Sequence, residues 1–331
     1  MDIVKSFDIN CNQNYHNQIM QKDEFVFVKH RKKNKKWANK NMDDPQIIFI
    51  YKTLNQNKDL LLDKRFFTTR LRMTCENILS TKFWHHNFSL LSHSIHKISS
   101  VHKLISDEDK NFDINDHSKI QVLMILFGLG HFSTSIQSFH QLAFFSAIAN
   151  YIEKASEKFD LLSIINYDPC YDYSEKQILI DNLRHTLIPD NNDCKFDISR
   201  YLSLNFTPYM PSDILENCLI IVYMPHCDMI HYENLLCGNY LNTLKVVVSN
   251  AVSNNLSKAI LNKTILIGNS FASMSSKNIS NHLKSLYPCI YALLREGSVE
   301  EIPLVNDYKI KDTEKSWDDI FNDTSLHLFS L

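Results

Sequence analysis

The chain has 331 residues, of which 44% are hydrophobic and 11% aromatic, and its formal net charge is −2. A chain of this length and composition can bury a full core and form one large domain with an accessory region. No apolar run approaches the roughly 18 residues that a membrane-spanning helix needs, so the sequence excludes this class. The eight cysteines form no CxxC pair, and no signal-peptide pattern is present. We therefore expect free thiols and a cytoplasmic protein.

The first segment, residues 1–45, is polar and rich in Asn and Lys, and it has no sustained periodicity. This composition predicts disorder. A basic island within it fits the pattern of a short nuclear-import signal, which would also bring the protein to the nucleus; an RNA-touching arm and a solvated linker are the alternatives. The cations that import proteins would contact are Lys29, Arg31, Lys32, Lys33, Lys35 and Lys36.

Residues 46–117 are predicted to form a helical region. Apolar residues recur at helical spacing over 59–102, with a break near 80–81, so two amphipathic helices are expected. Histidines crowd the second helix, and His93 and His96 stand three apart on one face. They are candidate metal ligands, but no Glu or Cys completes the set, and a polar helix face is the alternative.

Residues 118–331 are predicted to form an α/β domain. Six apolar residues, 122–127, lead into the turn 128–130, and a helical apolar period begins at Ile136. A strand buried by helices on both faces has this pattern. Further strands are expected at 161–167, 185–188, 218–224 and 264–267. Together they predict a Rossmann-like doubly wound, mostly parallel sheet with helices on both faces, preceded by an N-terminal helical region.

Several boundaries between these strands follow from local signals. A capping box of Ser174 and Gln177 is expected to open a helix that runs to about Arg184. The segment 241–262 fits a strand or a helix equally well. A helix is expected over 283–294, with a charged loop after it.

Small or polar residues follow four of the predicted strands. In an open α/β sheet, ligands bind beyond the carboxyl ends of the strands, so we expect these residues to meet at one rim. The candidate ligand-binding residues are Gly128, Gly130, His131, Ser133, Asp168, His226, Cys227, Asn269 and Ser270.

The turn from Gly128 to Ser133 resembles a nucleotide-binding turn. It has the first two glycines of GxGxxG, but Ser133 replaces the third. Backbone amides there would receive an anion, and Asp168 at the end of the second strand would bind a ribose hydroxyl. The alternative is a tight turn in which Ser133 is the N-cap of the following helix.

His226 and Cys227 place an imidazole and a thiol at one strand end, and His231 follows on the next helix. They are candidate ligands for zinc or for a haem iron. A structural zinc site would also need Cys237 or Cys170. The alternative is a buried cysteine beside a hydrogen-bonded histidine.

The segment 268–272 nearly matches the nucleophile elbow of α/β hydrolases, with Ser270 as the nucleophile. Asp323 and His327 follow in the order of such a triad. Both lie on one short terminal segment instead of two separate loops, which argues against a hydrolase.

In order and spacing, the motifs resemble the SRR-like (sensitivity to red light reduced) domain family over about residues 118–329. The motifs that carry the resemblance are Phe127-Gly128-Leu129-Gly130, Tyr167-Asp168-Pro169, Met224-Pro225-His226-Cys227, Gly268-Asn269-Ser270-Phe271 and Phe321-Asn322-Asp323-Thr324-Ser325. The chain departs from the family between Leu241 and Asn262, where it is longer. No catalytic residues carry over from the family.

The resemblance implies a regulatory role. Plant members are linked to light signalling and the circadian clock, and animal members to clock-gene expression and the control of haem biosynthesis. We therefore expect a non-catalytic regulator that senses a small ligand, with haem as the candidate cofactor. The alternative is an enzyme that binds a nucleotide or S-adenosylmethionine, similar to a methyltransferase, although positions 124–127 lack the acid usual before such a turn. A scaffold without a ligand is a third possibility.

Overall fold

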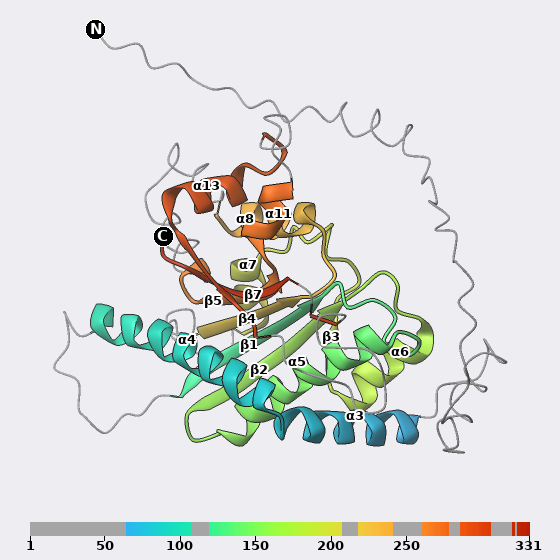
Figure 1. Cartoon of the computed structure of the whole chain (residues 1–331). Coiled ribbons are helices and arrows are strands. Elements are labelled where there is room, and N and C mark those ends of the chain that lie inside the picture. The colour runs from blue at the N-terminus through green and yellow to red at the C-terminus, as the bar shows by residue number, and fades with distance from the viewer. Residues whose placement is uncertain are drawn as a thin grey trace, which may run out of the picture. The chain divides into compact units, whose positions relative to one another are not determined.

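The computed structural model describes residues 64–106, 119–206, 218–240, 260–277, 285–305, 320–321 and 323–331. These residues all fall in one compact unit, 59–331. Their strands form one seven-stranded sheet of order β3-β2-β1-β4-β5-β7-β6 (Figure 1). The strands are β1 (Ile120–Phe127), β2 (Phe159–Tyr167), β3 (Thr186–Leu187), β4 (Cys218–Met224), β5 (Thr264–Asn269), β6 (Val299–Pro303) and β7 (Thr324–Phe329).

The first five strands are parallel, and β7 pairs antiparallel with both β5 and β6. The predicted α/β fold with a mostly parallel sheet is therefore confirmed. The order β3-β2-β1-β4-β5 is also that of the first strands in doubly wound dinucleotide-binding sheets. Likeness to Rossmann domains beyond this strand order stays a prediction.

Helices cover both faces of the sheet, as predicted (Figure 1). Val122, Met124 and Leu126 of β1 point into a core shared with α3, α4 and α5, because alternate side chains of a strand face opposite sides. The intervening residues of β1 face a second core, built with α7, α8, α11 and α13. The helices are α3 (Lys64–Leu79), α4 (Lys82–Ser106), α5 (Ile136–Lys154), α6 (Tyr173–Gln177), α7 (Ile198–Asn205), α8 (Met229–Tyr240), α11 (Phe271–Lys277) and α13 (Pro288–Glu296); a π-helical turn, Ile178–Asn182, follows α6.

The helical region before the sheet consists of α3 and α4, as predicted. The break between them lies at Thr81, whose hydroxyl accepts a hydrogen bond from the Trp84 amide at 3.1 Å and so begins α4. Phe67 of α3 packs against Phe139 of α5, with ring centroids 5.5 Å apart. Both helices thus belong to the same core as the sheet.

Two predicted local features are wrong. The charged loop after α13 contains β6, an edge strand whose exposed Glu300 is typical of protected sheet edges. The capping box lies two residues earlier than expected. It consists of Asp172 and Glu175, so Ser174 and Gln177 are inside the helix.

Other predictions lie outside the described residues. They concern the disordered segment 1–45 with its basic island, and most of the undecided segment 241–262. Among the helices that are described, none combines the length and apolar character needed to cross a membrane.

Candidate functional site

The glycine turn after β1 lies at the carboxyl edge of the sheet. Gly128 and Gly130 have φ angles of +68° and +74°, in the left-handed region that glycine adopts without strain. The carbonyl of Gly128 accepts a hydrogen bond from the His226 amide at 3.2 Å, so the turn is joined to the end of β4. The turn then leads into α5, whose N-cap is Ser135, so the alternative in which Ser133 caps this helix is wrong.

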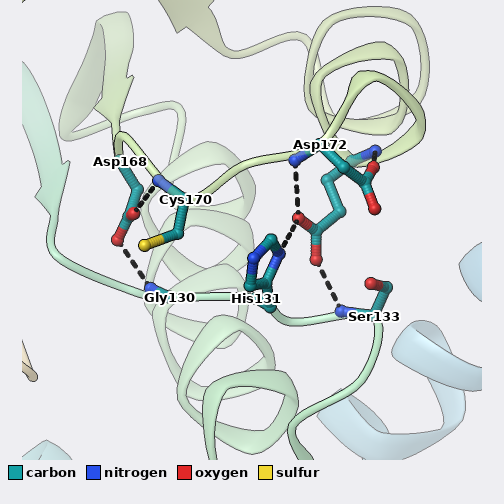
Figure 2. A network of polar contacts seen from close by, with 7 residues as sticks. Gly130, His131, Ser133, Asp168, Cys170 and Asp172 are labelled. Carbon is teal, nitrogen blue, oxygen red and sulfur yellow. Dashed lines mark hydrogen bonds and ion pairs between the residues drawn. The ribbon is translucent and has the colours of Figure 1, made fainter.

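Asp168 follows β2 and is only 5% exposed. One carboxylate oxygen accepts a hydrogen bond from the Gly130 amide at 2.6 Å, and the other accepts one from the Cys170 amide at 2.7 Å (Figure 2). The carboxylate therefore connects the turn after β1 with the segment after β2. The nucleotide-turn interpretation assigned the Gly130 amide to a ligand, but this amide already donates to Asp168.

Glu175 is the second acid beneath the turn, and its side chain is fully buried. Its carboxylate accepts hydrogen bonds from the amides of Ser133, at 2.8 Å, and Asp172, at 3.1 Å. It also lies 3.0 Å from Nδ1 of His131, whose ring is half exposed (Figure 2). The capping box explains its position, because the third residue of α6 turns back toward the chain that precedes the helix.

These two carboxylates accept hydrogen bonds from two backbone amides of the turn, which would otherwise be available to an anionic ligand. In a phosphate-binding turn, free amides point at the ligand. Here the Gly130 and Ser133 amides already have carboxylate acceptors, and an added phosphate would meet two negative groups. The geometry therefore disfavours a phosphate at this turn and favours an uncharged or cationic group.

A buried polar network lies at the end of β2, next to Asp168 in the chain. The Asn166 side chain bridges Tyr171 and His185, at 2.9 Å and 3.0 Å. Burial lowers the pKa of His185 to about 4, so its ring is neutral near pH 7 and can accept a hydrogen bond from the Asn166 amide group. Because all three residues are buried, the end of β2 is held in one arrangement.

The two neighbours at the end of β4 have different environments. Cys227 is 5% exposed, and its thiol contacts the Phe127 carbonyl beneath the glycine turn. A thiol hydrogen bond with Cys194, together with burial, raises the pKa of Cys227 well above its ordinary value. His226 is exposed at the rim, although partial burial of its ring lowers its pKa against the opposing effect of Asp168.

Asn269 joins the end of β5 to the same rim. Its side-chain amide donates to the Cys227 carbonyl at 3.1 Å, and its backbone amide donates to the Tyr232 hydroxyl at 2.8 Å. Tyr232 in turn donates to the Met224 carbonyl. Ser270 directly precedes α11, and its hydroxyl accepts from the Ser273 amide at 2.9 Å.

The strand ends that the sequence predicted to converge are thus adjacent in the structure. Hydrogen bonds link Asp168 to Gly130, the turn to His226, and Cys227 to Asn269. Sequence reasoning missed Glu175 and Tyr232, which hold this rim together. The spacing of Asp172 and Glu175 directly after Asp168 was a usable signal for the first of them.

The hydrolase interpretation is wrong, because the three side chains do not form a triad, although the Ser270 amide donates to the Asp323 carbonyl at 2.7 Å. The Asp323 carboxylate accepts from the Ser273 hydroxyl at 3.0 Å. The His327 ring is fully buried beside the Leu266 carbonyl, 3.1 Å away, and Glu301. His327 pairs with Leu266 of β5, which is several residues before Ser270, and the Ser270 hydroxyl serves as a helix cap.

Among the described residues, two groups of side chains bring potential metal ligands within 4.8 Å of one another. One is the rim group of His131, Asp172 and Glu175, and the other is Glu233, Cys237 and Cys289. Neither includes the predicted pair His93 and His96, which are exposed on α4.

Comparison with known families matches the chain to the SRR1 domain over residues 110–328. The match covers the whole rim and every strand of the sheet except the last residue of β7. No curated protein and no solved structure gives a match. The matched segment is well over half of the chain, and the chain therefore belongs to the SRR1 domain family.

Proposed function

We propose that this protein is a non-catalytic regulator that responds to a small ligand at the carboxyl rim of its sheet. Family membership supports a role in clock-gene expression and in the control of haem biosynthesis. We place this role in the cytoplasm and, because of the basic island, also in the nucleus. The observation that carries the proposal is the meeting of four strand ends, with exposed imidazoles of His226 and His131 beside the buried carboxylates of Asp168 and Glu175.

Haem is the first candidate ligand, and His226 suits it better than Cys227. Iron is ligated by a neutral imidazole nitrogen, and the lowered pKa of His226 favours that form. Its ring also lies at the surface, where a large planar group has access. The Cys227 thiol is enclosed beneath Gly128 and kept protonated, whereas haem iron is bound by the thiolate.

Titration with haemin tests this assignment. We expect the wild-type chain to shift the Soret band, and His226→Ala to weaken haemin binding about tenfold or more, because an axial ligand is lost. Cys227→Ala should leave the band position unchanged. His93→Ala, which removes an exposed imidazole on α4, is the matched control. An unaltered titration for His226→Ala, or no shift for the wild type, contradicts haem binding at the rim.

The second candidate is an enzyme that binds a nucleoside or S-adenosylmethionine. The strand order, with a glycine turn after β1 and an acid after β2, favours it. Because carboxylates occupy the turn amides, the ligand would carry no phosphate there. The sulfonium of S-adenosylmethionine has the sign of charge that suits Asp168 and Glu175.

Thermal unfolding in the presence of matched ligands tests this candidate. We expect adenosine or S-adenosylmethionine to raise the melting temperature by several degrees, because a ligand that binds only the folded state stabilises it by mass action. ATP, which has the same base and sugar, should have little effect at equal concentration. An equal rise with ATP and adenosine would show that the turn accepts phosphate. No rise with any of them counts against a nucleoside site.

A further inference from the structure

A second cluster of reactive side chains lies away from the rim, where α8 packs against α13. Glu233 and Cys237 stand one turn apart on α8, and Cys289 is in the first turn of α13. Their ligand atoms all lie within 4.8 Å of one another. Cys237 is eight residues from the start of α8, so it is about 12 Å along the helix from the rim.

The first turn of α13 brings the three side chains of the cluster together. Its N-cap, Tyr287, provides no side-chain hydrogen bond. Instead, the Glu233 carboxylate accepts from the amides of Cys289, at 2.8 Å, and Ile290, at 3.0 Å. An acid at a helix N-terminus satisfies free amides and complements the helix dipole. This cap brings the Cys289 thiol to the side of Glu233 that faces Cys237.

Both thiols also form hydrogen bonds with this carboxylate. The Cys237 sulfur lies 3.1 Å from Oε1 of Glu233. A hydrogen bond with the Cys237 thiol, followed by burial and the Glu233 charge, raises the pKa of Cys289. Two thiolates beside a carboxylate would require a positive charge among them.

The dimensions of the cluster suit a small thiophilic cation. Zinc binds cysteine sulfur at about 2.3 Å and carboxylate oxygen at about 2.1 Å, so neighbouring ligands of a tetrahedral site lie about 3.6 Å apart. The observed separations, from 3.1 Å to at most 4.8 Å, need only small side-chain rotations. Glu233 and Cys289 are buried, and Cys237 is half buried. The fourth position would thus face the partly open side and hold a water molecule.

We propose that Glu233, Cys237 and Cys289 form a binding site for a divalent thiophilic cation of the zinc type, which ties α8 to α13. Binding exchanges the two thiol protons for one cation, and the protons leave to solvent. The carboxylate keeps its hydrogen bonds to the α13 amides and uses Oε1, which already faces Cys237, as the oxygen ligand.

Cobalt titration of the full-length protein tests the site. The reduced protein, treated with a chelator and then freed of it, is titrated with Co²⁺ as a spectroscopic substitute for Zn²⁺. We expect a thiolate-to-cobalt charge-transfer band and the visible bands of tetrahedral cobalt, both abolished when Zn²⁺ is added. Cys237→Ser and Cys289→Ser should each remove the charge-transfer band or weaken it strongly. Cys170→Ser, which changes an exposed cysteine outside the cluster, is the matched control and should retain it.

Two further measurements separate loss of the site from loss of the fold. Circular dichroism of Cys237→Ser should match the wild type, because the side chain is only half buried. Zn²⁺ should raise the melting temperature of the wild type and of Cys170→Ser, but not of Cys237→Ser. The proposal is overturned if no charge-transfer band develops, or if the band survives in both cluster variants. It is also overturned if exposure to air lowers the number of free thiols by two and Zn²⁺ does not prevent this loss. Cys237 and Cys289 would then form a disulfide instead of a metal site.

Discussion

Replacement of Glu175 by alanine is expected to lower the free energy of unfolding by about 3 kcal/mol or more. The fully buried carboxylate accepts from the Ser133 and Asp172 amides and pairs with His131. Both hydrogen bonds are partly buried, and a donor left without an acceptor costs about 1 to 3 kcal/mol, so the two lost acceptors together account for about 3 kcal/mol. Urea unfolding followed by circular dichroism measures the change.

Two further variants sharpen this test. Glu175→Gln retains one carbonyl oxygen but sets an NH2 group against a backbone donor, so its loss should be smaller than that of alanine. Glu153→Ala removes an exposed carboxylate from α5 and should change stability by about 0.5 kcal/mol or less. If Glu175→Ala unfolds at nearly the same urea concentration as Glu153→Ala, the carboxylate does not hold the rim together.

The parallel part of the sheet was predictable because its strands are buried on both faces. Runs such as 122–127 and 218–224 contain no polar residue that interrupts the apolar pattern. Each run is followed by a turn, which marks the end of the strand. Parallel strand ends must lie at one edge, so the neighbourhood of Asp168, His226 and Asn269 followed from topology alone. The position of the rim in the fold could therefore be predicted from the sequence.

The contacts within the rim were not predictable in the same way. Asp172 with Glu175, and Ser174 with Gln177, fit the capping-box pattern equally well in sequence. The first pair is used because Glu175 is also the acceptor for the Ser133 amide, 42 residues away along the chain. Local spacing carries no information about this long-range partner, and for this reason the wrong register was chosen.

The antiparallel edge was missed for a related reason. In β7 all six residues are buried, including Thr324, Ser325 and His327, so the strand lacks both an apolar run and a polar alternation. These polar groups are tolerated because they find partners across the sheet, such as Glu301 of β6 for Ser325. Strand β6 carries adjacent glutamates and is read as a loop unless its partner is known.

Replacement of Gly128 by alanine is the second change with a large expected effect, a loss of about 3 kcal/mol or more in the free energy of unfolding. Its φ of +68° strains any residue with a side chain. In addition, the new Cβ would lie 2.4 Å from the Cys227 sulfur, which is enclosed and has little freedom to move. Thermal and urea unfolding measure the loss.

A control and a double-mutant cycle separate these two causes. Gly297 ends α13 with a φ of +65° and has open space around it, so Gly297→Ala reports backbone strain alone, about 1 to 2 kcal/mol. Cys227→Ala removes the sulfur, after which the nearest atom to the new Cβ would be the backbone nitrogen at 3.6 Å. The double variant should therefore be more stable than the sum of the single losses predicts, by about 2 kcal/mol. Additive losses would mean that the thiol does not pack beneath the turn, and the argument that Cys227 is shielded from ligands at the rim would fail with it.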